Sequence, residues 1–149
     1  MNINYKFIKH ETIGDAPFIG ALICGTTCKL KCKNCHNQHL KDLPVKTKSA
    51  KEIITEIKSN TFNHGIIFGG LEWTFQMKEA IFLACLAQES ELKTILYTGK
   101  NDLLPEDMQC FDFVKIGEYM EERYSPRKTK YGVILASDNQ KILERGVDY

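Results

Sequence analysis

The segment from Cys28 to Asn37 reads C-K-L-K-C-K-N-C-H-N and carries three thiols in the spacing C-x₃-C-x₂-C. Thiolates this close in sequence can converge on one metal centre, and soft sulfur ligands favour zinc or an iron–sulfur cluster. Cys28, Cys32 and Cys35 are one ligand short of the usual four for either. A [4Fe–4S] cluster held by these three would keep one iron open. The rest of the chain must therefore supply either a fourth ligand or a site for a bound cofactor.

The same segment has a second interpretation as a closed, structural zinc site. His36 or His39 would then be the fourth ligand, as in other short Cys/His loops that bind zinc. The remaining cysteines, Cys24, Cys85 and Cys110, fall in apolar stretches. Free cysteine at such positions commonly packs as a small buried hydrophobe, so we expect none of these three to act as a ligand.

The composition is that of one soluble globular domain spanning residues 1–149, with 43% hydrophobic and 26% charged residues. A net charge of +1 creates no strong electrostatic attraction to nucleic acid or to a membrane surface, so neither is expected as a partner. The chain shows no leader pattern and no apolar run long enough to span a bilayer, and we expect a cytoplasmic protein. Six cysteines in that compartment favour metal binding or catalysis over disulfides.

Segments typical of strands and helices alternate along the chain. Strands are predicted at residues 18–24, 64–68, 94–98, 111–116 and 131–136. Helices are predicted from residue 50 to about 59, after the capping box Ser49-Ala50-Lys51-Glu52, and at 75–89 and 138–144. This rhythm favours parallel units with right-handed crossovers. We expect an α/β fold, specifically a partial, open (β/α) barrel of about five parallel strands, with ligands at the carboxyl ends of the strands.

The cysteine spacing directly after a first strand resembles the radical S-adenosylmethionine (SAM) superfamily. Within it, the chain resembles the activating enzymes of anaerobic (class III) ribonucleoside-triphosphate reductase, and four features in the family's order carry this likeness. They are Cys35-His36-Asn37, Tyr97-Thr98-Gly99, the apolar run from Asp112 to Gly117, and Ser137-Asp138-Asn139-Gln140. Two segments depart from the family pattern. G-G-L-E-W stands at residues 69–73 where the family has G-G-D/E-P, and Gly14-Asp15-Ala16-Pro17 lacks the G-x-G and arginine expected upstream of the first strand.

The resemblance implies a cofactor, a reaction and partners. It implies a [4Fe–4S] cluster on the three cysteines, SAM on the open iron, and reductive cleavage of SAM to methionine and a 5′-deoxyadenosyl radical. It further implies a radical SAM oxidoreductase that installs a glycyl radical on a large partner enzyme similar to anaerobic ribonucleotide reductase. A flavodoxin or a ferredoxin-type protein would donate the electron. The alternatives are a radical SAM enzyme acting on a small molecule, peptide or RNA, or a non-enzymatic zinc or iron–sulfur binding module.

The resemblance also suggests which residues contact SAM, while no catalytic residue is expected beyond the cluster ligands. The suggested residues are His36, Asn37, Gly69, Gly70, Glu72, Thr98 and Lys115. The two glycines would let the ligand approach the backbone, or would form only a strand-end turn. Thr98 could bond the ribose or carboxylate of SAM, or could cap a turn. Lys115 lies in an apolar strand and would pair with the SAM carboxylate, or would be solvated on an edge strand.

Lys29, Lys31 and Lys33 alternate with the cysteines and are either a solvated basic loop or a surface that steers an acidic electron donor. If they steer the donor, replacing all three with glutamine will slow reduction of the cluster by flavodoxin and flatten its dependence on salt. Stopped-flow reduction at several ionic strengths measures both effects. Unchanged kinetics would leave only the solvated-loop interpretation.

Overall fold

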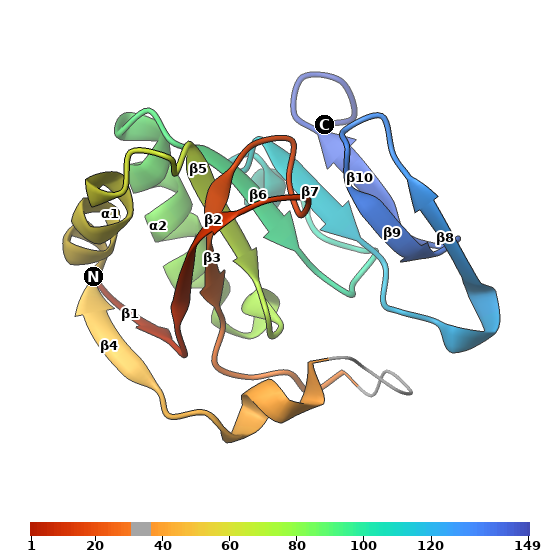
Figure 1. Ribbon diagram of the computed structural model, residues 1–149, viewed down its shortest axis with the longest axis horizontal. Coiled ribbons are helices and arrows are strands. Elements are labelled where there is room, and N and C mark those ends of the chain that lie inside the picture. The colour runs from red at the N-terminus through yellow and green to blue at the C-terminus, as the bar shows by residue number, and fades with distance from the viewer. Residues whose placement is uncertain (31–36) are drawn as a thin grey trace.

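The computed structural model describes residues 1–30 and 37–149. Its main feature is a six-stranded mixed sheet with the strand order β10-β7-β6-β5-β3-β2 (Figure 1). Four neighbouring strands are parallel, namely β3 (Gly20–Cys24), β5 (Gly65–Gly69), β6 (Lys93–Tyr97) and β7 (Phe113–Ile116). The edge strands run antiparallel to their neighbours, β2 (Ile8–Thr12) beside β3 and β10 (Lys141–Glu144) beside β7.

Two small ribbons flank this sheet. One pairs β1 (Asn2–Tyr5) with β4 (Lys46–Ser49), and the other is the hairpin of β8 (Tyr124–Lys128) and β9 (Ile134–Ser137). The helices are α1 (Ala50–Ser59), α2 (Met77–Glu89) and the single turn α3 (Pro105–Met108). Three short 3₁₀ segments complete the described chain, η1 (Gln38–Asp42), η2 (Trp73–Gln76) and η3 (Glu121–Arg123).

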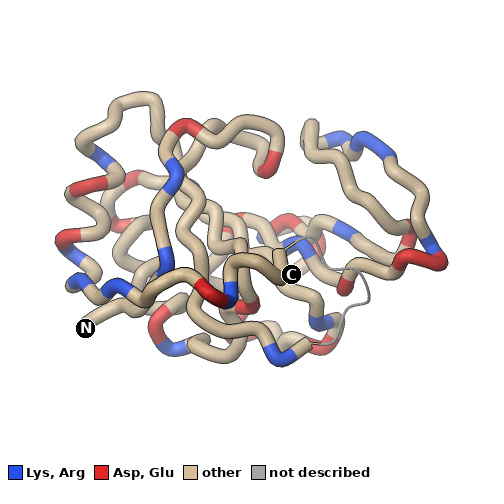
Figure 2. The backbone as a smooth tube through the Cα atoms, turned by 60° about the horizontal axis from the view of Figure 1, so that its bottom comes forward, with Lys and Arg blue, Asp and Glu red and all other residues tan. Residues whose placement is uncertain are grey.

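Charged positions of both signs are interspersed over the backbone (Figure 2), and their numbers nearly balance, with 20 Lys and Arg against 19 Asp and Glu. In the described part of the chain, every helix is too short or too polar to cross a bilayer.

The predicted (β/α) barrel is wrong, because the sheet is mixed and the structure has ten strands but few helices. A parallel pair needs a long crossover, usually a helix, and α1 and α2 supply one before β5 and β6. Only the single turn of α3 lies between β6 and β7, and no α-helix follows β7 within residues 117–149. The chain instead turns back and pairs β10 antiparallel to β7, which ends the series of parallel units.

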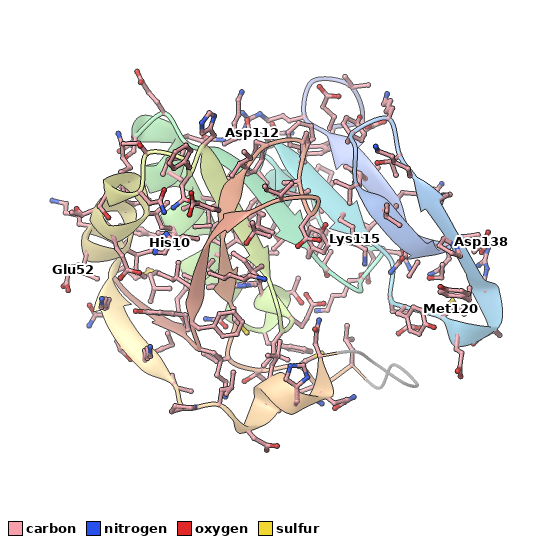
Figure 3. All side chains as sticks on the ribbon, in the orientation of Figure 1. His10, Glu52, Asp112, Lys115, Met120 and Asp138 are labelled. Carbon is pink, nitrogen blue, oxygen red and sulfur yellow. The ribbon has the colours of Figure 1, made fainter. Side chains whose placement is uncertain are left out.

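Two local predictions fail for the same reason. The segment 138–144, predicted as a helix, contains β10, and the predicted fifth parallel strand lies in the β8–β9 hairpin. Asp112, labelled in Figure 3, lies just before β7 and helps to hold the end of β10 in place. Its carboxylate accepts a 2.7 Å bond from the Arg145 guanidinium, just after β10, and a 2.9 Å bond from the Thr94 amide in β6.

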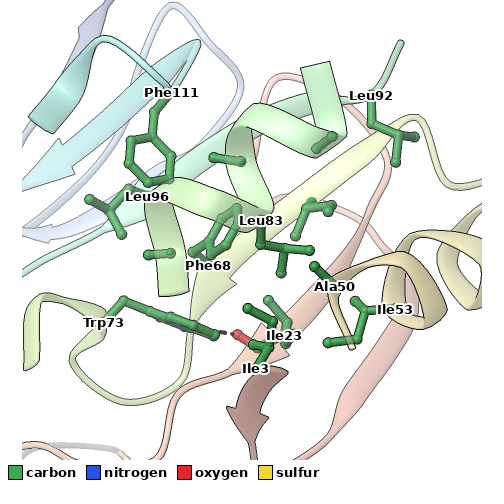
Figure 4. Close-up of a cluster of buried hydrophobic side chains, with 14 of the residues drawn as sticks. Ile3, Ile23, Ala50, Ile53, Phe68, Trp73, Leu83, Leu92, Leu96 and Phe111 are labelled. Atoms are coloured by element: carbon green, nitrogen blue, oxygen red, sulfur yellow. Dashed lines mark hydrogen bonds between the residues drawn. The ribbon is translucent and has the colours of Figure 1, made fainter. Parts of the chain in front are cut away.

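The first helix begins where the capping box predicts. The Ser49 hydroxyl oxygen accepts a 3.2 Å bond from the Glu52 amide, which satisfies one of the unpaired donors of the first turn. Buried side chains of α1 and α2 then pack on one face of the sheet (Figure 4).

The main core lies between these helices and the sheet. Phe68 of β5 is at its centre and makes edge-to-face contacts with Trp73 and Phe111, at ring-centroid distances of 5.2 and 5.4 Å. The indole nitrogen of Trp73 donates to the carbonyl of Ile23, the bond drawn in Figure 4. On the opposite face of the sheet, Ile67 packs in a smaller cluster, because neighbouring strand residues point to opposite faces.

Leu83→Ala tests how far stability depends on the main core. Leu83 is completely buried on α2, so its truncation should lower the free energy of unfolding by roughly 2–5 kcal/mol. Its neighbour Phe82 is 42% exposed, and Phe82→Ala should change that free energy by only about 0.5 kcal/mol or less. Urea unfolding measures both variants, and equal losses would contradict the assignment of the two helix faces.

Candidate cluster and cofactor site

A cavity of about 270 Å³ lies at the carboxyl ends of the parallel strands. The cysteine loop begins at its edge, and the β8–β9 hairpin forms another part of its wall. Seven of the residues predicted from sequence to contact the cluster or SAM line this one cavity: Cys28, Asn37, Gly69, Gly70, Glu72, Thr98 and Lys115. The other predicted site residues, Cys32, Cys35 and His36, lie outside the described residues.

Backbone hydrogen bonds fix the start of the cysteine loop against the loop that follows β5. The Gly25 amide donates to the carbonyl of Gly69 over 3.1 Å, and the Glu72 amide donates to the carbonyl of Thr27 over 3.0 Å. The parallel register places Cys24 opposite Gly69, so the two strands end at the same level. Cys28 is therefore held close to the β5 loop, and both segments line the cavity.

Cys28 is the only one of the three predicted cluster ligands within the described residues, and its thiol is half-buried at the edge of the cavity. It packs against a small apolar group formed by Cys24, Leu40 and Leu71. A soft thiol on an apolar support, beside a cavity, suits an iron–sulfur cluster. Among residues 1–30 and 37–149, no group of three or more His, Cys, Asp or Glu side chains is placed to hold a metal ion.

Cys24 is fully buried, as expected from its apolar surroundings. Burial raises the pKa of its thiol to about 11, so the thiol is protonated at neutral pH. Because the thiolate is the form that binds metals, Cys24 is poorly suited to be a fourth ligand. Its sulfur instead fills the space beneath Gly70.

The backbone at Gly70 requires glycine. Its φ of +78° lies in the left-handed region, and a Cβ built there would be 2.4 Å from the Cys24 sulfur. The strand-end turn and the packing on Cys24 thus suffice to explain this glycine. Access of a ligand to the backbone at Gly69 and Gly70 stays a prediction.

Glu72 joins the loop after β5 to the end of β6. Its side chain is 5% exposed, and one carboxylate oxygen accepts a 2.8 Å bond from the Gly99 amide. The other oxygen accepts from the Thr98 hydroxyl over 2.9 Å, and from the hydroxyl and amide of Thr74 over 2.8 and 3.2 Å. The carboxylate thus accepts four hydrogen bonds, three at one oxygen and one at the other. Glu72 therefore holds the cavity wall together, while its predicted contact with SAM stays untested.

Thr98 is 2% exposed and caps the turn after β6, one of the two roles expected of it, while its bond to SAM stays a prediction. Its hydroxyl donates to Glu72 and accepts a 3.0 Å bond from the amide of Lys100 two residues later. This second bond is the local turn pattern expected of threonine.

Lys115 brings a buried positive charge to the cavity. It is 8% exposed and lies on β7, which pairs with both β6 and β10, so an edge strand does not explain it. Its ammonium donates a 2.7 Å bond to the carbonyl of Gly117 and lies 5.8 Å from the centroid of the Tyr97 ring. These contacts place the positive charge of Lys115 at the wall of the cavity.

Sequence reasoning missed the part of the cavity wall made by the hairpin. Ile134, Leu135 and Ala136 of β9 line the cavity, and Gln140 holds them there. The Gln140 side-chain oxygen accepts from the amides of Ala136 and Ser137 over 3.0 and 3.1 Å, and its nitrogen donates to Gly117 over 3.4 Å. The segment Ser137-Asp138-Asn139-Gln140 was the available signal, although it was interpreted as the start of a helix.

Glu72→Gln tests the junction between β5 and β6. An amide nitrogen in place of either oxygen would face the Gly99 or Thr74 N–H and leave a buried donor without an acceptor. We expect a loss of roughly 1–3 kcal/mol in the free energy of unfolding of the apoprotein. Glu89→Gln, at an exposed position on α2, is the matched control and should change it by about 0.5 kcal/mol or less. A loss no larger than the control's would contradict the role given to Glu72.

The comparisons with known proteins agree with the chemistry of the cysteine loop. The model of the family described as "4Fe-4S single cluster domain" matches residues 20–143, which include all three loop cysteines and the cavity-lining segments from Cys28 to Gln140. No curated protein matches the chain. Because the family model covers well over half of the sequence, the chain belongs to the 4Fe-4S single cluster domain family and is an iron–sulfur cluster-binding protein.

Proposed function

We propose that this iron–sulfur protein is a radical SAM oxidoreductase that generates a glycyl radical on a separate large enzyme. The observation that carries the proposal is the shared cavity, in which Cys28 meets residues from the ends of β5, β6 and β7. A cluster held by three cysteines has one open iron, and the cavity provides space for a small ligand beside it. Its volume of about 270 Å³ is near the lower end for small-molecule sites.

The residues of the chain have distinct tasks in this proposal. Cys28, Cys32 and Cys35 supply thiolates to the cluster. Glu72 fixes the distance between the loops after β5 and β6, and Lys115 provides positive charge for the carboxylate of SAM. When bound, the reduced cluster and SAM together supply the radical chemistry, so the protein's contribution is ligation, orientation and access.

The surface around the cavity supports a protein as the substrate. Ile134 lines the cavity and is 67% exposed, so an apolar side chain at the cavity wall is open to contact with a partner. We propose that the glycine-bearing loop of a partner similar to anaerobic ribonucleotide reductase reaches the cavity past this hairpin.

A separate surface feature supports a flavodoxin or ferredoxin-type electron donor. Phe75 is 39% exposed, and the ammonium groups of Lys29 and Lys100 lie 5.8 and 5.1 Å from its ring centroid. Lys29 directly follows Cys28, so this basic and aromatic surface adjoins the cysteine loop. Positive charge there would attract a small acidic redox protein.

The decisive experiment is a SAM cleavage assay. The protein is reconstituted anaerobically with iron and sulfide and incubated with SAM and a chemical reductant, and 5′-deoxyadenosine is measured by chromatography. We expect product from the wild type and from the matched control Cys85→Ser, but only background from Cys28→Ala. If a wild-type sample with a full cluster gives only background product, the proposed SAM cleavage is wrong and iron–sulfur binding alone stands.

A second experiment identifies the substrate. Addition of a candidate glycyl-radical enzyme to an active sample should give a glycyl-type doublet in the electron paramagnetic resonance spectrum. Cleavage of SAM without a protein radical, across candidate reductases, would instead favour a small molecule, peptide or RNA as substrate.

A further inference from the structure

The thiols of Cys85 and Cys110 meet on the side of the molecule away from the cavity wall just described. Their sulfurs are 2.8 Å apart, and both residues are half-buried, so a small oxidant can reach them. Cys85 lies within α2, and Cys110 lies between α3 and β7. Because the cavity is lined by the carboxyl end of β7, Cys110 is at the opposite end of that strand.

We propose that Cys85 and Cys110 are a modification site, at which a low-molecular-weight disulfide such as oxidised glutathione converts the pair into an intramolecular disulfide. The pair is chemically separate from the cluster cysteines, and the inference does not depend on the proposed function.

The surrounding contacts hold the two residues close together. The side-chain amide of Gln88, one helical turn after Cys85, donates a 3.0 Å bond to the carbonyl of Cys110. The Thr94 hydroxyl of β6 donates to the same carbonyl over 3.4 Å. The backbone of Cys110 is thus tied to the helix that carries Cys85, and the sulfurs need to approach by under about 1 Å to reach the usual S–S length of roughly 2.05 Å.

The reaction is balanced as two successive thiol–disulfide exchanges. The thiolate of one cysteine attacks oxidised glutathione, forms a mixed disulfide and releases one glutathione thiolate. The second cysteine then attacks the mixed disulfide, forms the S–S bond to its neighbour and releases the second glutathione. The two protein thiols lose two electrons and two protons in total, and the oxidant becomes two thiols.

The protonation of the pair determines how fast it reacts. Burial, together with the contact with the Cys85 thiol, raises the pKa of Cys110 to about 11. The thiolate is the reactive form, so the pair should remain reduced with little oxidant at neutral pH and react faster as the pH rises.

Peptide mapping of the cluster-loaded, full-length protein tests the proposal. The protein is treated anaerobically with oxidised glutathione, free thiols are alkylated, and the tryptic peptides are analysed by mass spectrometry without reduction. The expected product links peptide 79–93, which contains Cys85, to peptide 101–115, which contains Cys110, and disappears after treatment with dithiothreitol. Cys85→Ser should lose this product and leave Cys110 as a mixed disulfide with glutathione.

Oxidation of the wild type should also raise its thermal midpoint by several degrees, because the bond closes a loop between residues 25 positions apart. The same treatment should not raise the midpoint of Cys85→Ser, because that variant cannot close the loop. The proposal is overturned if both cysteines are recovered as alkylated thiols or as separate mixed disulfides. It is also overturned if either one is linked to a cluster cysteine.

Discussion

The carboxylate of Glu72 is the interaction on which the arrangement of the site depends. It is buried, and it binds groups from its own loop and from the end of β6, so the ends of two neighbouring parallel strands are joined by one side chain. The Glu72 amide also donates to Thr27 in the segment that leads to Cys28. One residue therefore couples the cysteine loop, the β5 loop and the end of β6. The fixed position of Cys28 relative to the cavity follows from this coupling.

Elements with strong local sequence signals could be predicted from the sequence. The strand at 18–24 and the helix after Ser49 appear close to their predicted bounds, because continuous apolar residues and a capping serine are local signals. The overall architecture could not be predicted in this way. Whether β10 pairs parallel or antiparallel depends on the connection after β7 and on distant contacts such as the Arg145–Asp112 ion pair. Those contacts leave no periodic pattern in the sequence.

The candidate site likewise has a part that could be predicted from the sequence and a part that could not. The convergence of Gly70, Thr98 and Lys115 was predictable, because each follows or ends a parallel strand and such ends meet at one edge of a sheet. The internal bonds of Glu72 and the wall formed by β9 were not predictable, because they depend on side chains that meet only after the hairpin has folded back. Family membership establishes iron–sulfur cluster binding, and the central proposal beyond it is the radical chemistry.

That claim requires one iron of the cluster to bind SAM within the cavity. Mössbauer spectroscopy of protein reconstituted with ⁵⁷Fe, recorded with and without SAM, observes this binding directly. The account predicts that SAM changes the spectrum of a single iron of the [4Fe–4S] cluster, because the three irons held by cysteine keep their ligands. Identical spectra at saturating SAM, from a sample with a full cluster, would contradict it.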